Sequence, residues 1–139
     1  MHSIILTIHN KDWMIREVVE GICKNTIENY ELIVVIDGCT DNTESVVLET
    51  LKNKNIDFKL IFAPDVFETK ANNLGLKIAQ GDKVIIVQDD MIIKEHGWNQ
   101  RMQKPFDKFD DVFAVTSRTA HDWELNPKTE HLGMKENLD

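Results

Sequence analysis

Short runs of aliphatic residues alternate along the chain with segments whose apolar residues recur at helical spacing. The aliphatic runs predict strands that are buried on both faces, the kind found in parallel sheets covered by helices. The predicted strands are residues 3–8, 32–36, 58–62, 84–89 and 112–116. The predicted helices are residues 12–24, a helix that opens after residue 41, and residues 68–80 and 96–109. This alternation predicts an α/β fold with a doubly wound, mostly parallel sheet.

The turns between these elements carry recognisable start and stop signals. Asp41 followed by Glu44 resembles a capping box, and Gly81 is a helix stop. Pro105 is expected to interrupt or end the last helix. The apolar period disappears from Glu124 onward, so we expect one domain over residues 1–123 and a polar tail or arm over 124–139.

Composition excludes several classes of protein. A net charge of −8 argues against a nucleic-acid partner, because no clustered Lys and Arg side chains are available to neutralise phosphates. Cys23 and Cys39 have no metal-site spacing and are expected to be reduced thiols of a cytoplasmic protein. No apolar run approaches the length of a transmembrane segment, and the N-terminus lacks the features of a signal peptide.

Two adjacent carboxylates, Asp89 and Asp90, directly follow the aliphatic run of residues 84–87. Adjacent carboxylates repel each other unless a cation or a shared proton intervenes. Mg²⁺-type sites commonly use one or two carboxylates and complete their shell with phosphate and water. The pair therefore indicates a metal that holds a diphosphate, although a solvated turn after a strand is the alternative for the pair alone.

Polar side chains follow three of the predicted strands at the point where each strand ends. They are residues 7–10 after the first strand, Asp37 after the second and the acid pair after the fourth. Open α/β sheets bind ligands beyond the carboxyl ends of their strands, so these groups predict one nucleotide site. The chain contains neither a GxGxxG nor a GxxxxGK[ST] motif, which argues against a Rossmann dinucleotide site and a P-loop.

Four segments in order, residues 3–10, 32–43, 70–82 and 87–90, resemble the nucleotide-sugar half of a family 2 glycosyltransferase with the GT-A fold. The resemblance extends over residues 1–117. It implies a metal-dependent enzyme that moves a sugar from a UDP-sugar donor to an acceptor with inversion. In this chain Ile36 and Gln88 stand where many members carry a further Asp.

The resemblance also implies a role for each site residue. Thr7 and His9 would lie beside the uracil, and Asp37 would accept a hydrogen bond from the base. Lys70 would face the diphosphate or the base, and Asp89 would face the ribose. Asp90 would ligate Mn²⁺ or Mg²⁺. Structural alternatives stand beside these roles. Asp37 precedes a glycine and is a common turn former, Lys70 is a candidate solvated side chain, and His9 a candidate rim histidine.

Inverting transfer needs a general base within hydrogen-bond reach of the acceptor hydroxyl. The candidates in this chain are Asp122 and Glu124, and His121 or His131 are candidates to complete the metal shell. Three alternatives stay open: a minimal transferase, a donor-binding fragment that only hydrolyses the donor, and a noncatalytic nucleotide-sugar-binding module. A nucleotidyltransferase is disfavoured because the N-terminus lacks a Gly-rich basic loop. The donor sugar and the acceptor also stay open.

Aromatic residues gather late in the chain, at Trp98, Phe106, Phe109, Phe113 and Trp123. If they form an exposed apolar surface, that surface marks an interaction site. Closed homodimers are the commonest way to cover such a surface, so we expect a homo-oligomer.

Overall fold

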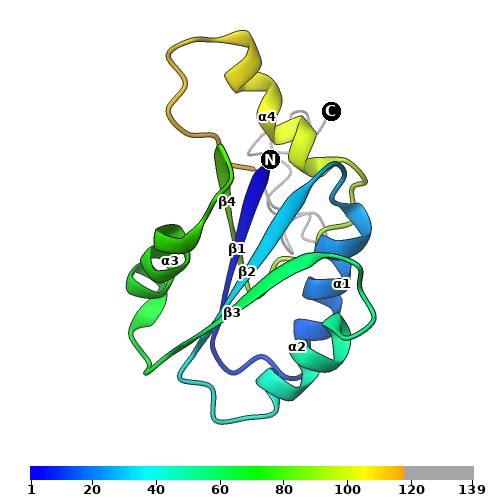
Figure 1. Cartoon of the computed structure of the whole chain (residues 1–139), viewed down its shortest axis with the longest axis vertical. Helices are drawn as coiled ribbons and strands as arrows, with labels where there is room; N and C mark the ends of the chain where they lie inside the picture. The colour runs from blue at the N-terminus through cyan, green and yellow to red at the C-terminus, as the bar shows by residue number, and fades with distance from the viewer. Residues whose placement is uncertain (118–139) are drawn as a thin grey trace, which may run out of the picture. The chain divides into compact units, whose positions relative to one another are not determined.

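A four-stranded parallel sheet is the centre of residues 1–101 (Figure 1). The computed structural model describes residues 1–117, and the chain divides into two units, residues 1–101 and 102–139. The strands are β1 (His2–Ile8), β2 (Tyr30–Asp37), β3 (Asp57–Ala63) and β4 (Lys83–Gln88), in the order β3-β2-β1-β4. All neighbouring strands pair in parallel, as the sequence predicts.

Helices cover both faces of this sheet. They are α1 (Ile15–Asn25), α2 (Thr43–Leu51) and α3 (Phe67–Ile78). A fourth helix, α4 (Trp98–Lys108), includes residues of both units. Figure 1 shows α3 on one side of the sheet and α1 with α2 on the other. The predicted doubly wound α/β architecture is therefore confirmed. No helix within residues 1–117 is long and apolar enough to cross a membrane.

The two central strands form the core. Ile5 on β1 and Ile33 on β2 are fully buried, and they pack with Ala71 of α3 on one face of the sheet. Each such aliphatic side chain contributes roughly 1.5–3 kcal/mol through burial. Gly75 lets α3 approach closely, because a Cβ there would lie 2.7 Å from the Cγ2 atom of Ile5.

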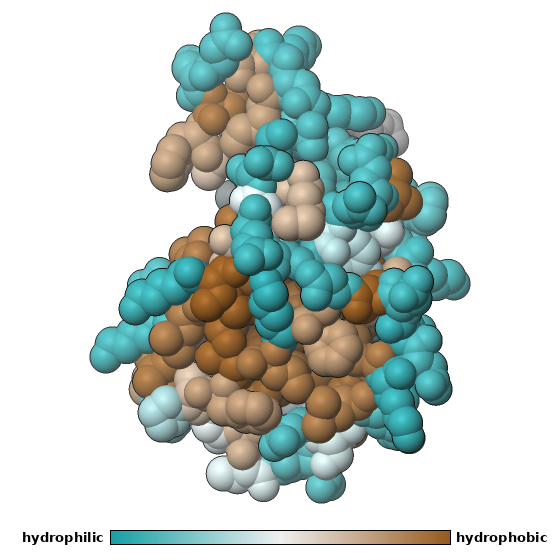
Figure 2. Space-filling model, viewed as in Figure 1, coloured by the Kyte–Doolittle hydropathy of each residue, from teal (hydrophilic) through white to brown (hydrophobic). Residues whose placement is uncertain are grey.

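The two outer strands, β3 and β4, are less buried than β1 and β2. On β4 the side chains of Val84 and Ile86 are exposed, so the expectation that this strand is buried on both faces is wrong. Phe62 on β3 is an exposed aromatic side chain. In Figure 2, which has the view of Figure 1, apolar surface appears where β3 faces the viewer.

Three further expectations about the elements are wrong. Residues 112–117 form neither strand nor helix, because an apolar run becomes a strand only when a neighbouring strand pairs with its backbone. Pro105 lies inside α4, and Phe109 N–H donates to its carbonyl at 3.0 Å, so the helix continues past it. The capping box does not form: Asn42 stands at the cap of α2, and its side chain makes no capping hydrogen bond.

Asp41 still holds the start of α2, by a different arrangement. One oxygen of its carboxylate accepts the Thr43 N–H at 3.0 Å, and the other accepts the Asp12 N–H at 3.1 Å. Burial would raise the pKa of Asp41, but these hydrogen bonds outweigh burial and lower it. The residue therefore connects the segment before α1 to the start of α2.

One of the expected exposed aromatics, Trp98, differs in the structure. Trp98 is buried and donates its Nε1–H to the Thr26 hydroxyl at 3.0 Å, so it does not belong to an exposed apolar surface. In the second unit, Phe113 is 98% exposed and Phe109 is half exposed. Trp123 lies outside the described residues.

A buried ion pair joins the starts of the strands, at the edge opposite their carboxyl ends. Glu31 of β2 is fully buried and lies 2.5 Å from the Nζ of Lys59 on β3. Its other oxygen accepts from the Ser3 hydroxyl at 2.5 Å and from the Gln80 N–H at 2.6 Å. Burial would raise the pKa of Glu31, but the hydrogen bonds from Lys59, Ser3 and Gln80 lower it to about 2.

We expect Glu31→Gln to lower the free energy of unfolding by about 3 kcal/mol at pH 7, because it breaks a buried pair and leaves Lys59 without its partner. A carboxylate whose pKa is depressed on folding stabilises the fold above its ordinary pKa of 4.5, and that contribution is lost as the pH falls toward about 2. Urea unfolding at pH 7 and pH 3 should show the difference between wild type and variant shrinking at the lower pH.

Glu49→Gln is the matched control, since Glu49 pairs with Arg16 on the surface at 2.6 Å. Exposed pairs contribute little to stability. Equal destabilisation by the two variants would contradict a special role for the buried pair.

Candidate functional site

A hollow of about 300 Å³ lies at the carboxyl ends of the strands, within residues 1–101. Polar side chains from β1, β2 and α3, and the end of β4, dominate its lining. The lining residues are Thr7, His9, Asp37, Asp65, Phe67, Glu68, Asn72, Val87, Gln88, Asp89 and Asp90. Five of the residues singled out from the sequence, namely Thr7, His9, Asp37, Asp89 and Asp90, are therefore brought together at one edge.

Lys70 is the site residue that the structure does not bring to this hollow. It is exposed on α3 and is not among the lining residues, whereas the neighbouring Asn72 is. Ala71 between them faces the sheet and is fully buried. A contact between Lys70 and a diphosphate or base stays a prediction, and its exposure agrees with the alternative of a solvated side chain.

The lining of the hollow is strongly acidic. Its carboxylates are Asp37, Asp65, Glu68, Asp89 and Asp90, and none of the described residues that line it is Lys or Arg. A diphosphate placed here would be repelled unless a cation lay between it and the carboxylates. The charge of the hollow therefore fits a ligand that arrives with a positive ion.

Asp90 is exposed at the end of β4 and lies beside Asp89. Within residues 1–117, no three His, Cys, Asp or Glu side chains are grouped so that they could hold a metal ion. This part of the chain offers one or two carboxylates, which fits Mn²⁺ or Mg²⁺ held jointly by protein, phosphate oxygens and water. His121 and His131, the further candidate ligands, lie outside the described residues.

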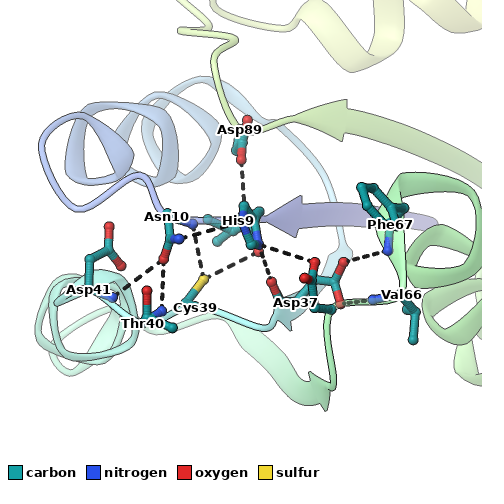
Figure 3. Close-up of polar contacts among 11 residues, drawn as sticks. His9, Asn10, Asp37, Cys39, Thr40, Asp41, Val66, Phe67 and Asp89 are labelled. Atoms are coloured by element: carbon teal, nitrogen blue, oxygen red, sulfur yellow. Dashed lines mark hydrogen bonds and ion pairs between the residues drawn. The ribbon is translucent and has the colours of Figure 1, made fainter.

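His9 links the end of β1 to Asp37 on one side and to Asp89 on the other (Figure 3). Its Nδ1 lies 2.6 Å from the backbone carbonyl of Asp37, and since a carbonyl only accepts, this nitrogen carries the hydrogen. Its backbone N–H donates to the Asp89 carboxylate at 3.0 Å. The ring is therefore held in one orientation, and Asp89 is fixed against the end of β1.

Asn10 joins the loops that follow β1 and β2. Its backbone has a φ of 47°, and its side-chain oxygen accepts the Thr40 N–H at 2.8 Å. Its own N–H donates to the sulfur of Cys39 at 3.3 Å. Cys39 is thus part of the turn, and burial raises the pKa of its thiol.

Asp37 has a structural role that the sequence analysis missed. The residue is 2% exposed, and its carboxylate accepts the Val66 N–H at 2.8 Å on one oxygen and the Phe67 N–H at 2.9 Å on the other (Figure 3). It therefore holds the first turn of α3 from the end of β2. No local signal could reveal this contact, because its partners lie 29 and 30 residues further along the chain. A hydrogen bond from Asp37 to a base stays a prediction.

Gly38 makes this turn possible. Its φ is +59°, and a Cβ there would lie 2.6 Å from the Cβ of Asp65. Its N–H donates to the Ala63 carbonyl at 2.8 Å. The close approach brings the end of β2 next to the segment between β3 and α3.

The first turns of α3 contribute residues that the sequence analysis also missed. The Thr7 hydroxyl donates to the side-chain oxygen of Asn72 at 2.7 Å, and the Gln88 amide donates to Glu68 at 2.9 Å. These contacts connect α3 to the ends of β1 and β4. Helical spacing predicts a helix here, but it does not tell which polar side chains meet the strand ends.

The predicted general bases, Asp122 and Glu124, lie outside the described residues. So does the predicted tail over residues 124–139.

Comparison with known proteins agrees with this geometry. Residues 3–138 match the model of the family described as glycosyl transferase family 2. The glycosyltransferase GlyG of Streptococcus pneumoniae is 32% identical over 110 residues, which are 79% of this chain and 36% of GlyG. The chain thus spans little more than a third of that relative.

Two solved structures share the fold. One is a structure of residues 1–349 of TarS of S. aureus in complex with UDP-GlcNAc, which has a TM-score of 0.66 and 24% sequence identity to this chain. The match covers 86% of this chain and 36% of the TarS chain. The other is the glucosyl-3-phosphoglycerate synthase of Mycobacterium tuberculosis in complex with Mn²⁺, UDP and phosphoglyceric acid, which has a TM-score of 0.54 and 17% sequence identity. This match covers 76% of this chain and 38% of the synthase chain. The match to the family model spans nearly the whole sequence, and on that basis the chain belongs to the family 2 glycosyltransferases.

Proposed function

We propose that the hollow binds the UDP part of a UDP-sugar together with Mn²⁺ or Mg²⁺, as the donor site of an inverting glycosyltransferase. The observation that carries this proposal is the hollow itself: five carboxylates and no described Lys or Arg line it, at the carboxyl ends of parallel strands. The complexes of TarS with UDP-GlcNAc and of the mycobacterial synthase with Mn²⁺ and UDP support it by analogy of fold.

The lining residues suggest an arrangement for the donor. Thr7 and His9 would face the uracil, and Asp89, held through one oxygen by the His9 N–H, would accept a ribose hydroxyl through the other. Asp90 would ligate the metal. When bound, the metal would neutralise charge that develops on the departing diphosphate.

Asp122 and Glu124 are our candidates for the base that deprotonates the acceptor. If either acts in this way, Asp122→Asn or Glu124→Gln should lower transfer far more than donor binding, because the lost interaction exists only in the transition state. Steady-state rates and UDP titration on the same variants separate the two effects. Unchanged transfer in both variants would remove these residues from the mechanism.

A second candidate function is a noncatalytic nucleotide-sugar-binding module, or a protein that only hydrolyses the donor. Both candidates share the donor site, so they differ in turnover and not in UDP binding.

A panel of nucleotide sugars with Mn²⁺ tests the proposal, with thermal shift and release of free nucleoside diphosphate as the two readouts. We expect UDP-sugars to raise the melting temperature and to release UDP when a suitable acceptor is present. A thermal shift without release would favour the binding module, and no shift with any nucleotide sugar would contradict both candidates.

Three further expectations stay predictions. They are a homo-oligomer, a cytoplasmic location and the absence of a nucleic-acid partner.

A further inference from the structure

Phe67 combines two unfavourable features at the rim of the hollow. Its φ is +67°, a left-handed backbone conformation that is a rare outlier for a bulky side chain. Its side chain is 77% exposed, so the ring gains little from burial. Backbone strain of this kind persists only where the surroundings hold it, and it gathers at ligand sites.

The surroundings that hold Phe67 are visible. The Asp37 carboxylate accepts its N–H at 2.9 Å and that of Val66 at 2.8 Å, while the Val66 side chain packs against the core beneath α3. Asp65, two residues earlier, is also left-handed with a φ of 55°. The structure thus fixes the backbone of this turn and leaves the aromatic ring in solvent.

The ring lies at one side of the hollow, and Figure 3 shows the Asp37 carboxylate between Phe67 and His9. Asp37 ends β2, whereas the acid pair follows β4, which is two strands away in the sheet order. Two strand spacings are roughly 10 Å. A nucleoside diphosphate with its phosphates at the acid pair would therefore extend its base toward Phe67 and His9.

We propose that Phe67 is a stacking surface for the nucleobase of the donor, an inference that rests on the proposed function and deepens it. Every base has an aromatic face, so a ring of this kind adds affinity without choosing among bases. The hydrogen-bonding groups that line the same hollow, such as Thr7 and Asn72, are the ones that would discriminate between bases. Phe67 thus contributes to binding of any base-bearing diphosphate and not to binding of the diphosphate alone.

The test compares UDP with pyrophosphate, each titrated calorimetrically with Mn²⁺ into the full chain. Phe67→Ala should weaken UDP binding about tenfold, and Phe67→Tyr should keep it, because stacking needs a ring and not its detailed chemistry. Pyrophosphate binding should be the same in all three proteins. Phe62→Ala is the matched control, since Phe62 is an exposed aromatic outside the hollow, and it should leave both affinities unchanged.

Phe67→Gly separates stacking from a structural role. Glycine adopts a positive φ without strain, so this variant should be at least as stable to urea as Phe67→Ala while binding UDP equally weakly. Equal UDP affinity in wild type and Phe67→Ala would overturn the stacking role and leave the proposed function standing. An equal loss of UDP and pyrophosphate would also overturn it, and a wild type that binds no UDP would overturn both.

Discussion

Asp90→Asn is expected to remove the metal-dependent part of UDP binding and to leave the fold intact. An amide is neutral and a much weaker ligand for a hard divalent cation than a carboxylate. The affinity for UDP in Mn²⁺ should fall at least about tenfold, which corresponds to about 1.4 kcal/mol. The free energy of unfolding should stay close to the wild-type value, because Asp90 is an exposed side chain at the end of β4. Calorimetry with UDP and urea unfolding measure the two quantities.

Asp57→Asn is the matched control for this change. Asp57 is exposed at the start of β3, at the opposite edge of the sheet, and its substitution alters the net charge by the same amount. UDP binding should be unaffected in the control. An equal effect of both variants would mean that overall charge, and not a ligand at Asp90, determines the affinity.

Asp37→Ala is expected to lower both the free energy of unfolding and the affinity for the donor nucleotide. It removes the acceptor for the N–H groups of Val66 and Phe67, and hydrogen bonds to a charged group contribute about 1.5–3 kcal/mol each. The free energy of unfolding should fall by about 3 kcal/mol or more. UDP affinity should fall at least about tenfold, because the turn that carries Phe67 loses its support.

Asp65→Asn is the control that distinguishes the loss of a negative charge in the hollow from the loss of the hydrogen bonds that support the turn. Asp65 also lines the hollow, but its side chain is 59% exposed, so its substitution removes charge and leaves the support in place. Its free energy of unfolding should match the wild type. If Asp37→Ala lost UDP affinity without any loss of stability, Asp37 would act on the base directly, as the family resemblance implies.

The strands β1 to β4 and their order along the chain could be predicted because a run of neighbouring apolar residues indicates each of them. The run of residues 84–87 is apolar at every position and forms β4, although Val84 and Ile86 are exposed and not buried as the pattern predicts. Once the strands are parallel, their carboxyl ends share an edge, and Thr7, Asp37 and Asp90 must lie near one another. The site residues that lie at the ends of strands could therefore be predicted from the sequence.

Residues that reach the site from α3 were not predictable in the same way. Glu68 and Asn72 line the hollow because of how α3 is rotated over the sheet, a tertiary property that helical spacing does not contain. The same holds for Lys70, which lies on the same helix but faces solvent. The expected strand over residues 112–116 failed for a related reason, since its apolar pattern could not supply a pairing partner.

Titration of UDP into the wild-type protein, once with Mn²⁺ and once with EDTA, tests the central claim most directly. The claim is that the acidic hollow at the strand ends holds a nucleoside diphosphate through a divalent cation. We predict binding in Mn²⁺ and an affinity at least about tenfold weaker in EDTA, because the carboxylates then repel the diphosphate. Equal affinity for UDP under the two conditions would contradict the claim.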